Sequence, residues 1–117
     1  MERVIQLTMW EVIKSKCLAT PVMIMLLEEA ALSAVEKYLT PGHKTVGTQL
    51  NIDHIAATPV GMRVVAHAEV AEIKGRKLIF KVWADDESER ICEGTHERIV
   101  VELERFDKRI ASKAGSG

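Results

Sequence analysis

A pair of glutamates lies inside the most apolar stretch of the chain, where charged side chains are uncommon. Residues 20–32 read TPVMIMLLEEAAL, so Glu28 and Glu29 follow six apolar residues, and Thr20 stands at the start. Charged side chains are seldom buried without a partner, so such a carboxylate either reaches solvent or is kept for chemistry. Beside a substrate, a carboxylate of this kind can act as a nucleophile or as a general base.

Helical geometry indicates which of these side chains could share a cleft. Thr20 and Glu28 are eight positions apart, which places them roughly 80° apart around a helix axis and two turns along it. Glu29 lies about 100° from Glu28, so only one of the two glutamates can easily face a sheet, and periodicity does not choose between them. Thr20 also fits the N-cap position of a helix, which is the commoner role of a threonine in such a place.

A histidine supplies a third polar group on an otherwise apolar face. His54 follows Val46, Leu50 and Ile52 at alternating positions near the end of a predicted strand. Imidazole can serve as base or acid near neutral pH, although a histidine on such a face is more often a hydrogen-bonded core residue. Three polar groups in one cleft would be a stronger signal, but spacing alone leaves open whether they meet.

Other kinds of chemistry find little support. The sequence contains no CxxC, P-loop or GxGxxG motif, and Cys17 and Cys92 do not have metal-ligand spacing. A net charge of −1 gives no basic surface for nucleic acid or an anionic membrane, and the longest apolar run is too short to span a bilayer. The N-terminal residues lack the apolar core of a signal peptide. We therefore expect a cytoplasmic protein with reduced thiols and without a metal, a nucleic-acid partner or a membrane span.

The elements that must position these side chains follow from the hydrophobic period. The 117 residues suffice for a single domain, with residues 113–117 as a flexible tail. A helix is predicted over 20–38, where Pro21 suits its first turn and residues 40–42 (TPG) end it. The period then changes to two. The predicted strands are 2–9, 45–57, 62–72, 77–84 and 89–103, followed by a short amphipathic helix near 104–112.

This order predicts an α+β hotdog fold, in which an antiparallel sheet wraps around one long central helix. We expect the last four strands to form a consecutive meander. Strict alternation in 45–57 places His54 on one face and Gly47 on the other. On the last strand, His96 and Arg98 share a face with Gly94, which suggests a groove or a dimer edge. One such unit leaves a sheet edge open, so edge-to-edge dimerisation is expected, and a tetramer is possible.

Several blocks of the sequence form a recognisable set. They are Ala19-Thr20, Glu28, Val46-Gly47-Thr48, residues 54–61 (HIAATPVG) and residues 94–98 (GTHER). In this order and spacing, from about Cys17 to Arg109, the chain resembles the fluoroacetyl-CoA thioesterase family of hotdog proteins.

The resemblance implies a homodimeric acyl-CoA thioesterase that needs no cofactor, because coenzyme A is part of the substrate. It implies catalytic roles for Thr20, Glu28 and His54. It also implies that the backbone amide of Gly47 helps to bind the thioester oxygen and that Arg98 contributes to substrate binding.

One departure from the family bears on the acyl group. The fluoroacetate-specific member carries a phenylalanine-containing lid segment before its catalytic threonine. Here no phenylalanine precedes Phe80, and Trp10 is the only aromatic residue upstream of Thr20. We therefore expect a broader or different short acyl-CoA rather than selectivity for the fluoroacetyl group.

The predicted reaction is hydrolysis of a short acyl-CoA to a carboxylate and free CoA. Two alternatives stay open at the level of sequence. One is a non-catalytic module that binds an acyl-CoA or another small ligand, since fold alone does not fix function. The other is a hotdog hydratase or dehydratase, which would change the acyl chain without releasing CoA.

Overall fold

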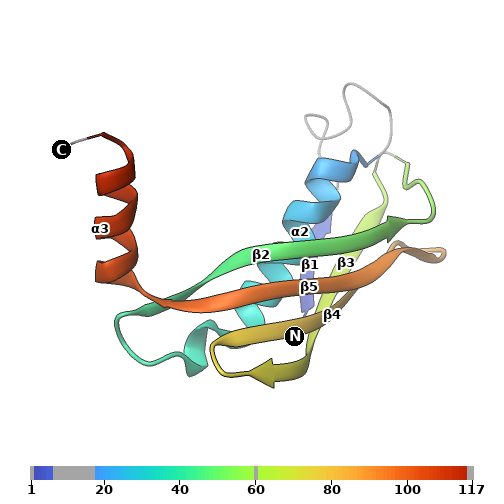
Figure 1. Cartoon of the computed structure of the whole chain (residues 1–117). Helices are drawn as coiled ribbons and strands as arrows, with labels where there is room; N and C mark the ends of the chain where they lie inside the picture. The colour runs from blue at the N-terminus through green and yellow to red at the C-terminus, as the bar shows by residue number, and fades with distance from the viewer. Residues whose placement is uncertain (1, 7–17, 60, 116–117) are drawn as a thin grey trace.

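The computed structural model describes residues 2–6, 18–59 and 61–115 and shows one antiparallel sheet packed against a long helix (Figure 1). Trp10 and Cys17 lie outside the described residues. The α+β class and the single central helix are confirmed. The elements are β1 (Glu2–Gln6), α2 (Thr20–Val35), the 3-10 turn η1 (Glu36–Tyr38), β2 (His43–His54), β3 (Arg63–Lys74), β4 (Lys77–Asp85), β5 (Arg90–Glu102) and α3 (Leu103–Lys113).

The strand order corrects one prediction. The sheet runs β1-β3-β4-β5-β2, with all neighbours antiparallel, so β3, β4 and β5 form a meander but β2 does not join it. The connection 55–62 between β2 and β3 is too long for a tight hairpin, and β1 takes the free side of β3. β2 therefore pairs with β5 and forms an edge of the sheet.

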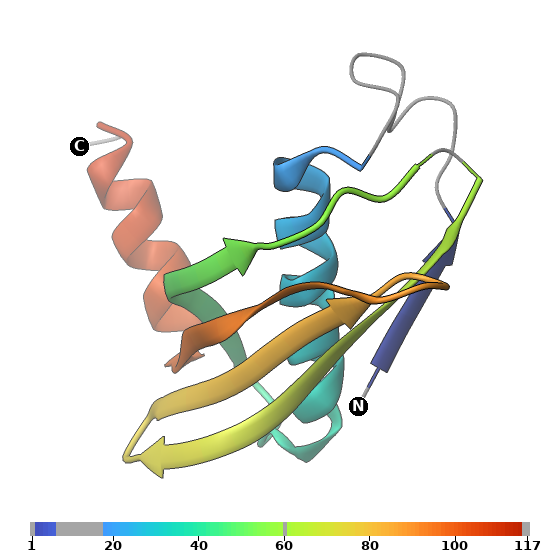
Figure 2. The same ribbon diagram turned by 90° about the vertical axis from the view of Figure 1, so that its right-hand side faces the viewer.

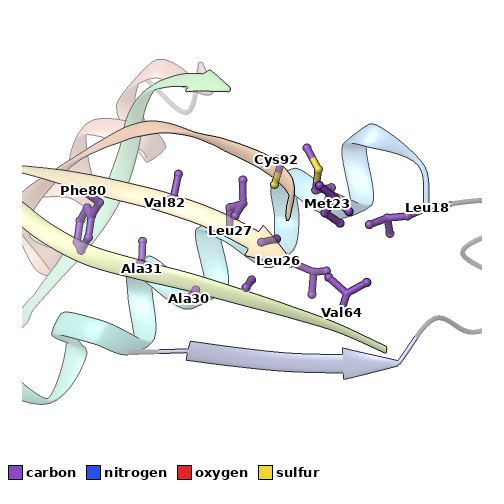
Figure 3. Packing of buried hydrophobic residues seen from close by; sticks show 14 of the residues in the cluster. Leu18, Met23, Leu26, Leu27, Ala30, Ala31, Val64, Phe80, Val82 and Cys92 are labelled. Atoms are coloured by element: carbon purple, nitrogen blue, oxygen red, sulfur yellow. The ribbon is translucent and has the colours of Figure 1, made fainter. Parts of the chain in front are cut away.

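The core lies between one face of α2 and the sheet (Figure 3). The buried helix residues follow the i, i+3, i+4, i+7 pattern of an amphipathic helix and are Met23, Leu26, Leu27, Ala30, Ala31 and Val35. They pack against inward-facing sheet residues such as Val64, Phe80 and Val82. α2 is not buried on all sides in the single chain, where Met25 is 51% exposed. Figure 2 shows the sheet curving around α2, while α3 stands apart at the end of β5.

The N-cap of the helix lies one residue earlier than predicted. Ala19 occupies the N-cap position without a side-chain hydrogen bond, and Thr20 is already helical. The capping role of Thr20 is therefore wrong. Its hydroxyl group is free for a contact outside the helix.

A β-bulge in β2 changes which side chains face the helix. Gly47 pairs with Arg98 and Gln49 with Glu97, so Thr48 is an extra residue in the ladder. An extra residue shifts the alternation by one position. Gly47, before the bulge, and His54, after it, therefore lie on the same face of the sheet. The strict alternation predicted for this strand is wrong, and the two residues expected on opposite faces both face α2.

Candidate active site

Thr20 and His54 form a hydrogen-bonded pair where α2 begins and β2 ends. Thr20 Oγ1 lies 2.9 Å from His54 Nδ1. His54 Nε2 is buried and has no hydrogen-bond partner among the described residues. The pair lines a cavity of about 430 Å³ whose walls are mainly the small and apolar residues Leu18, Ala19, Ile55, Ala56 and Ala57. A ring held at Nδ1 and unpartnered at Nε2 has one nitrogen left for proton exchange.

Glu28 lies two turns further along α2, against the middle of β2 and β5. Its Oε2 is 3.6 Å from Arg98 Nη1. The carboxylate side chain is 44% exposed, whereas the Arg98 side chain is only 9% exposed. A β-carbon on Gly47 would stand 3.0 Å from Glu28 Oε2. The glycine thus leaves room for the carboxylate to lie close against the strand.

Arg98 is held in place by three hydrogen bonds. Its Nε donates to Thr45 Oγ1 at 2.9 Å, Nη2 donates to the Thr45 carbonyl at 3.0 Å, and Nη1 donates to His96 Nε2 at 3.2 Å. Burial lowers the pKa of Arg98, while the Glu28 carboxylate opposes this. An arginine side chain remains protonated in a folded protein even when burial lowers its pKa. The guanidinium is therefore a fixed positive charge beside Glu28.

His96 is a site residue whose role was not predicted from the sequence. Its side chain is 2% exposed, and its Nδ1 lies 2.9 Å from the Gln49 carbonyl. The carbonyl can only accept and the guanidinium can only donate, so His96 is neutral with its proton on Nδ1. Burial lowers its pKa, as does Arg98, while the Gln49 carbonyl and Glu28 oppose them. The sequence placed His96 and Arg98 on one face but gave no indication that they touch.

The lowered pKa of His96 predicts how stability depends on pH. The unfolded chain takes up a proton at this histidine near pH 6.5, whereas the folded chain takes it up only at lower pH. The contribution of neutral His96 to the free energy of unfolding is therefore fully present above about pH 6.5. It is lost as the pH falls towards the pKa of His96 in the folded chain. In urea unfolding at pH 7.5 and 5.5, His96→Gln should lose less stability than the wild type between the two values. His43→Gln, at an exposed position, is the control, and an undiminished pH dependence in His96→Gln would contradict the assignment.

The predicted site residues thus fall into two clusters. Thr20 and His54 form the first, and Glu28, Gly47 and Arg98 form the second, which also includes His96. No hydrogen bond or ion pair joins Glu28 to His54, and Thr20 and Glu28 are eight helical positions apart, about 12 Å along the axis. Glu29, the other glutamate considered, is also half-buried, but the ion pair with Arg98 distinguishes Glu28.

Cys92 does not offer an alternative nucleophile. It is buried and free, and burial raises the pKa of its thiol to about 11. Such a thiol is protonated and inert near neutral pH. Within the described ranges, no group of three or more His, Cys, Asp or Glu side chains could hold a metal ion. None of the described helices is long and apolar enough to cross a membrane.

Comparison with known proteins points to one family. A family model of fluoroacetyl-CoA-specific thioesterases matches residues 2–104, which include every element from β1 to β5. A fluoroacetyl-CoA thioesterase from Streptantibioticus cattleyicolor is 40% identical over 99 residues, which cover 85% of this chain and 71% of that protein.

Solved structures agree with this similarity. A fluoroacetyl-CoA thioesterase structure matches with a TM-score of 0.92 at 31% identity, over 97% of this chain and 93% of that one. A mutant of the enzyme in complex with fluoroacetate and CoA matches with a TM-score of 0.88 at 32% identity, over 97% and 98%. A thioesterase superfamily member from Thermus thermophilus, 20% identical over 99% and 93%, has a TM-score of 0.89 and shares the fold.

Proposed function

Because this chain belongs to the fluoroacetyl-CoA-specific thioesterase family, we propose that it hydrolyses an acyl-CoA thioester to a carboxylate and free CoA. The observation that best supports this reaction is the Glu28 carboxylate, which lies against Gly47 and beside the fixed guanidinium of Arg98. The acyl group that we propose is short. We expect selectivity to be broader than for the fluoroacetyl group alone, since the upstream phenylalanine of the specific member has no counterpart in the sequence. The cytoplasm is the expected location.

The chemical step consumes one water. Glu28 takes a proton from that water, and the resulting hydroxide adds to the thioester carbonyl to form a tetrahedral oxyanion. The C–S bond then breaks, which forms the carboxylic acid, and the departing sulfur takes one proton from the protein and leaves as the CoA thiol. Glu28 gives up the proton that it took from water, so the protein returns to its starting state and the acid ionises to the carboxylate. The partial exposure of Glu28 admits water to the carboxylate, which favours the general-base role over direct attack by Glu28 on the carbonyl. In a single turnover in ¹⁸O-water, label found in Glu28 would show direct attack followed by hydrolysis at the Glu28 carbonyl, because base catalysis leaves Glu28 unlabelled.

The β-bulge offers a place for the oxyanion. Thr48 is the extra residue of the bulge, and an extra residue leaves a backbone group outside the ladder. Backbone N–H groups around Gly47 and Thr48 are therefore candidates to donate to the developing negative charge. The loss of one such donor typically slows acyl transfer by about 10²–10³-fold.

His54 is suited to protonate the leaving group, which requires that it lie beside the second cluster, the one that contains Glu28. Its unpartnered Nε2 could protonate the CoA thiolate, while the Thr20 hydroxyl fixes the ring through Nδ1. Within one chain, however, the two clusters do not touch. A second copy of the chain offers a way to bring them together.

We propose a homodimer in which β2 pairs with β2 of the partner subunit. β2 is a twelve-residue edge strand, and edges of this length are normally covered. Across the bulge, the β5 partners of Gly47, Asn51 and His54 are Arg98, Thr95 and Cys92. Counted along β5, Gly47 and His54 are each paired three residues away from the partner of Asn51, in opposite directions. Both face the side of the sheet that carries α2. A two-fold axis at Asn51 would set His54 of the partner subunit opposite Gly47, beside Glu28.

Complementation between two inactive variants tests the shared site. Glu28→Gln and His54→Gln homodimers should each be nearly inactive. A heterodimer of the two, isolated through two different affinity tags, would contain one site with both natural residues. We expect it to recover about half of the wild-type rate per dimer. A heterodimer as inactive as its parents would place each complete site within one subunit.

A further inference from the structure

A groove of about 230 Å³ lies at the opposite end of β2 from His54, between the β3–β4 turn, the end of β5 and α3. We call it the arginine groove. Its charged lining consists of Arg76, Arg105 and Arg109, together with a single carboxylate, Glu102. The chain as a whole carries a net charge of −1, so this excess of positive charge is local.

The arginines of the groove are not neutralised by the fold. Among the described residues, no ion pair engages any of the three. Arg105 and Arg109 are like charges at i, i+4 on α3, a spacing that destabilises a helix. In the same helix, Glu104 and Lys108 at the same spacing form a 3.6 Å ion pair. Lys44, whose Nζ lies 4.9 Å from the centre of the Phe106 ring, adds positive charge next to the groove. The groove is therefore suited to an anionic ligand.

The groove also lies at a suitable distance from the candidate active site. Arg98, beside Glu28, and Val100, which lines the groove, are alternate residues on the same face of β5. From Arg98 to Glu102, where α3 begins, β5 spans about 13 Å. The pantetheine arm of CoA is about as long as four extended residues, roughly 14 Å. A thioester at Glu28 would thus place the CoA phosphates near the groove.

We propose that the arginine groove binds the phosphate groups of coenzyme A, namely the diphosphate and the 3′-phosphate. This inference rests on the proposed thioesterase function. Guanidinium groups bind phosphate through paired, charge-assisted hydrogen bonds, and three of them match the several phosphate groups of CoA. Because the groove lies apart from Glu28 and His54, it contributes to binding and not to the chemical step.

Kinetics with matched thioesters test the proposal. The substrates carry one acyl group, the one that the wild type hydrolyses fastest, on CoA, on 3′-dephospho-CoA and on pantetheine. In Arg76→Gln/Arg105→Gln/Arg109→Gln, we expect KM for the acyl-CoA to rise about tenfold or more, with kcat unchanged. The acyl-pantetheine should be hydrolysed as by the wild type, and dephospho-CoA should show an intermediate effect. Lys108→Gln removes one positive charge from the same helix outside the groove and should change nothing.

Two results would overturn the assignment: an unchanged KM for the acyl-CoA in the triple variant, or an equal rise in KM for acyl-CoA and acyl-pantetheine. If the wild type hydrolyses none of the three thioesters, the thioesterase proposal fails, and calorimetry still tests the groove. The wild type should then bind CoA at least about tenfold more tightly than pantetheine, and the triple variant should lose this difference. Equal affinities in the wild type would count against the groove itself.

Discussion

Replacement of Glu28 by glutamine is expected to lower kcat for acyl-CoA hydrolysis by about 10²–10⁴-fold, the range typical of a lost general base. The amide keeps the size of the side chain and its room against Gly47, but it cannot take a proton from water. Its neutral oxygen also interacts more weakly with Arg98 than the carboxylate at 3.6 Å does. KM should change little, because the substituted atom acts on the reacting water. Steady-state release of free thiol measures both constants.

Glu29→Gln is the matched control for this change. It removes a carboxylate from the adjacent position of α2, which is also half-buried, without touching the group that faces Arg98. We expect its kcat to stay within a fewfold of the wild type. Glu28→Gln with near wild-type kcat, or equal losses in both variants, would show that the catalytic carboxylate has been misassigned.

Replacement of His54 by glutamine is expected to lower kcat by about 10²–10³-fold, as for the loss of a proton-transfer group. Glutamine can still hydrogen bond near Thr20, but it cannot deliver a proton to the leaving thiolate. An acyl-CoA analogue with a more acidic thiol needs less help at this step, so the deficit of His54→Gln should shrink with such a substrate. A deficit that is the same for both leaving groups would place His54 in another role.

Substitutions at Thr20 separate the hydroxyl from the rest of the side chain. Thr20→Ser keeps the oxygen that lies 2.9 Å from His54 Nδ1 and should retain most of the activity, whereas Thr20→Val should lose a substantial part of it. Since Ala19 is the N-cap residue, Thr20→Val should leave helix stability nearly unchanged. Thermal unfolding of the two variants distinguishes a role through His54 from a structural one.

The hydrophobic period predicted the helices and strands well, because the type of each element depends mainly on residues that are close in the sequence. The helix that carries Thr20 and Glu28 and the strands that bury Phe80 and Val82 follow directly from the hydrophobic period. The position of β2 beside β5 depends on pairing between strands that are far apart in the sequence, and the sequence of β2 alone does not encode this pairing. The predicted N-cap was wrong by one residue. A capping threonine would have used its hydroxyl within the helix, whereas Thr20 uses it to contact His54.

The candidate site could be predicted only in part, for a related reason. Glu28, Gly47 and Arg98 were each singled out by type or by resemblance, but their contact requires the register of β2 on β5. The bulge at Thr48 depends on long-range pairing, and without it Gly47 and His54 would face opposite sides. The sequence placed His96 on one face with Arg98 but did not predict its role, because a buried histidine shows its role only through its partners, here Gln49 and Arg98.

The most direct test of the account is the release of free thiol by the purified wild-type protein across a panel of short, branched and aryl acyl-CoAs that includes fluoroacetyl-CoA. We expect saturable release of CoA with one carboxylate formed per thiol, fastest for short acyl groups, and loss of this activity in Glu28→Gln. Thermal stabilisation by acyl-CoAs without thiol release would instead indicate a binding module. Conversion of the acyl chain with CoA still attached would indicate a hydratase or dehydratase, and either result would contradict the account.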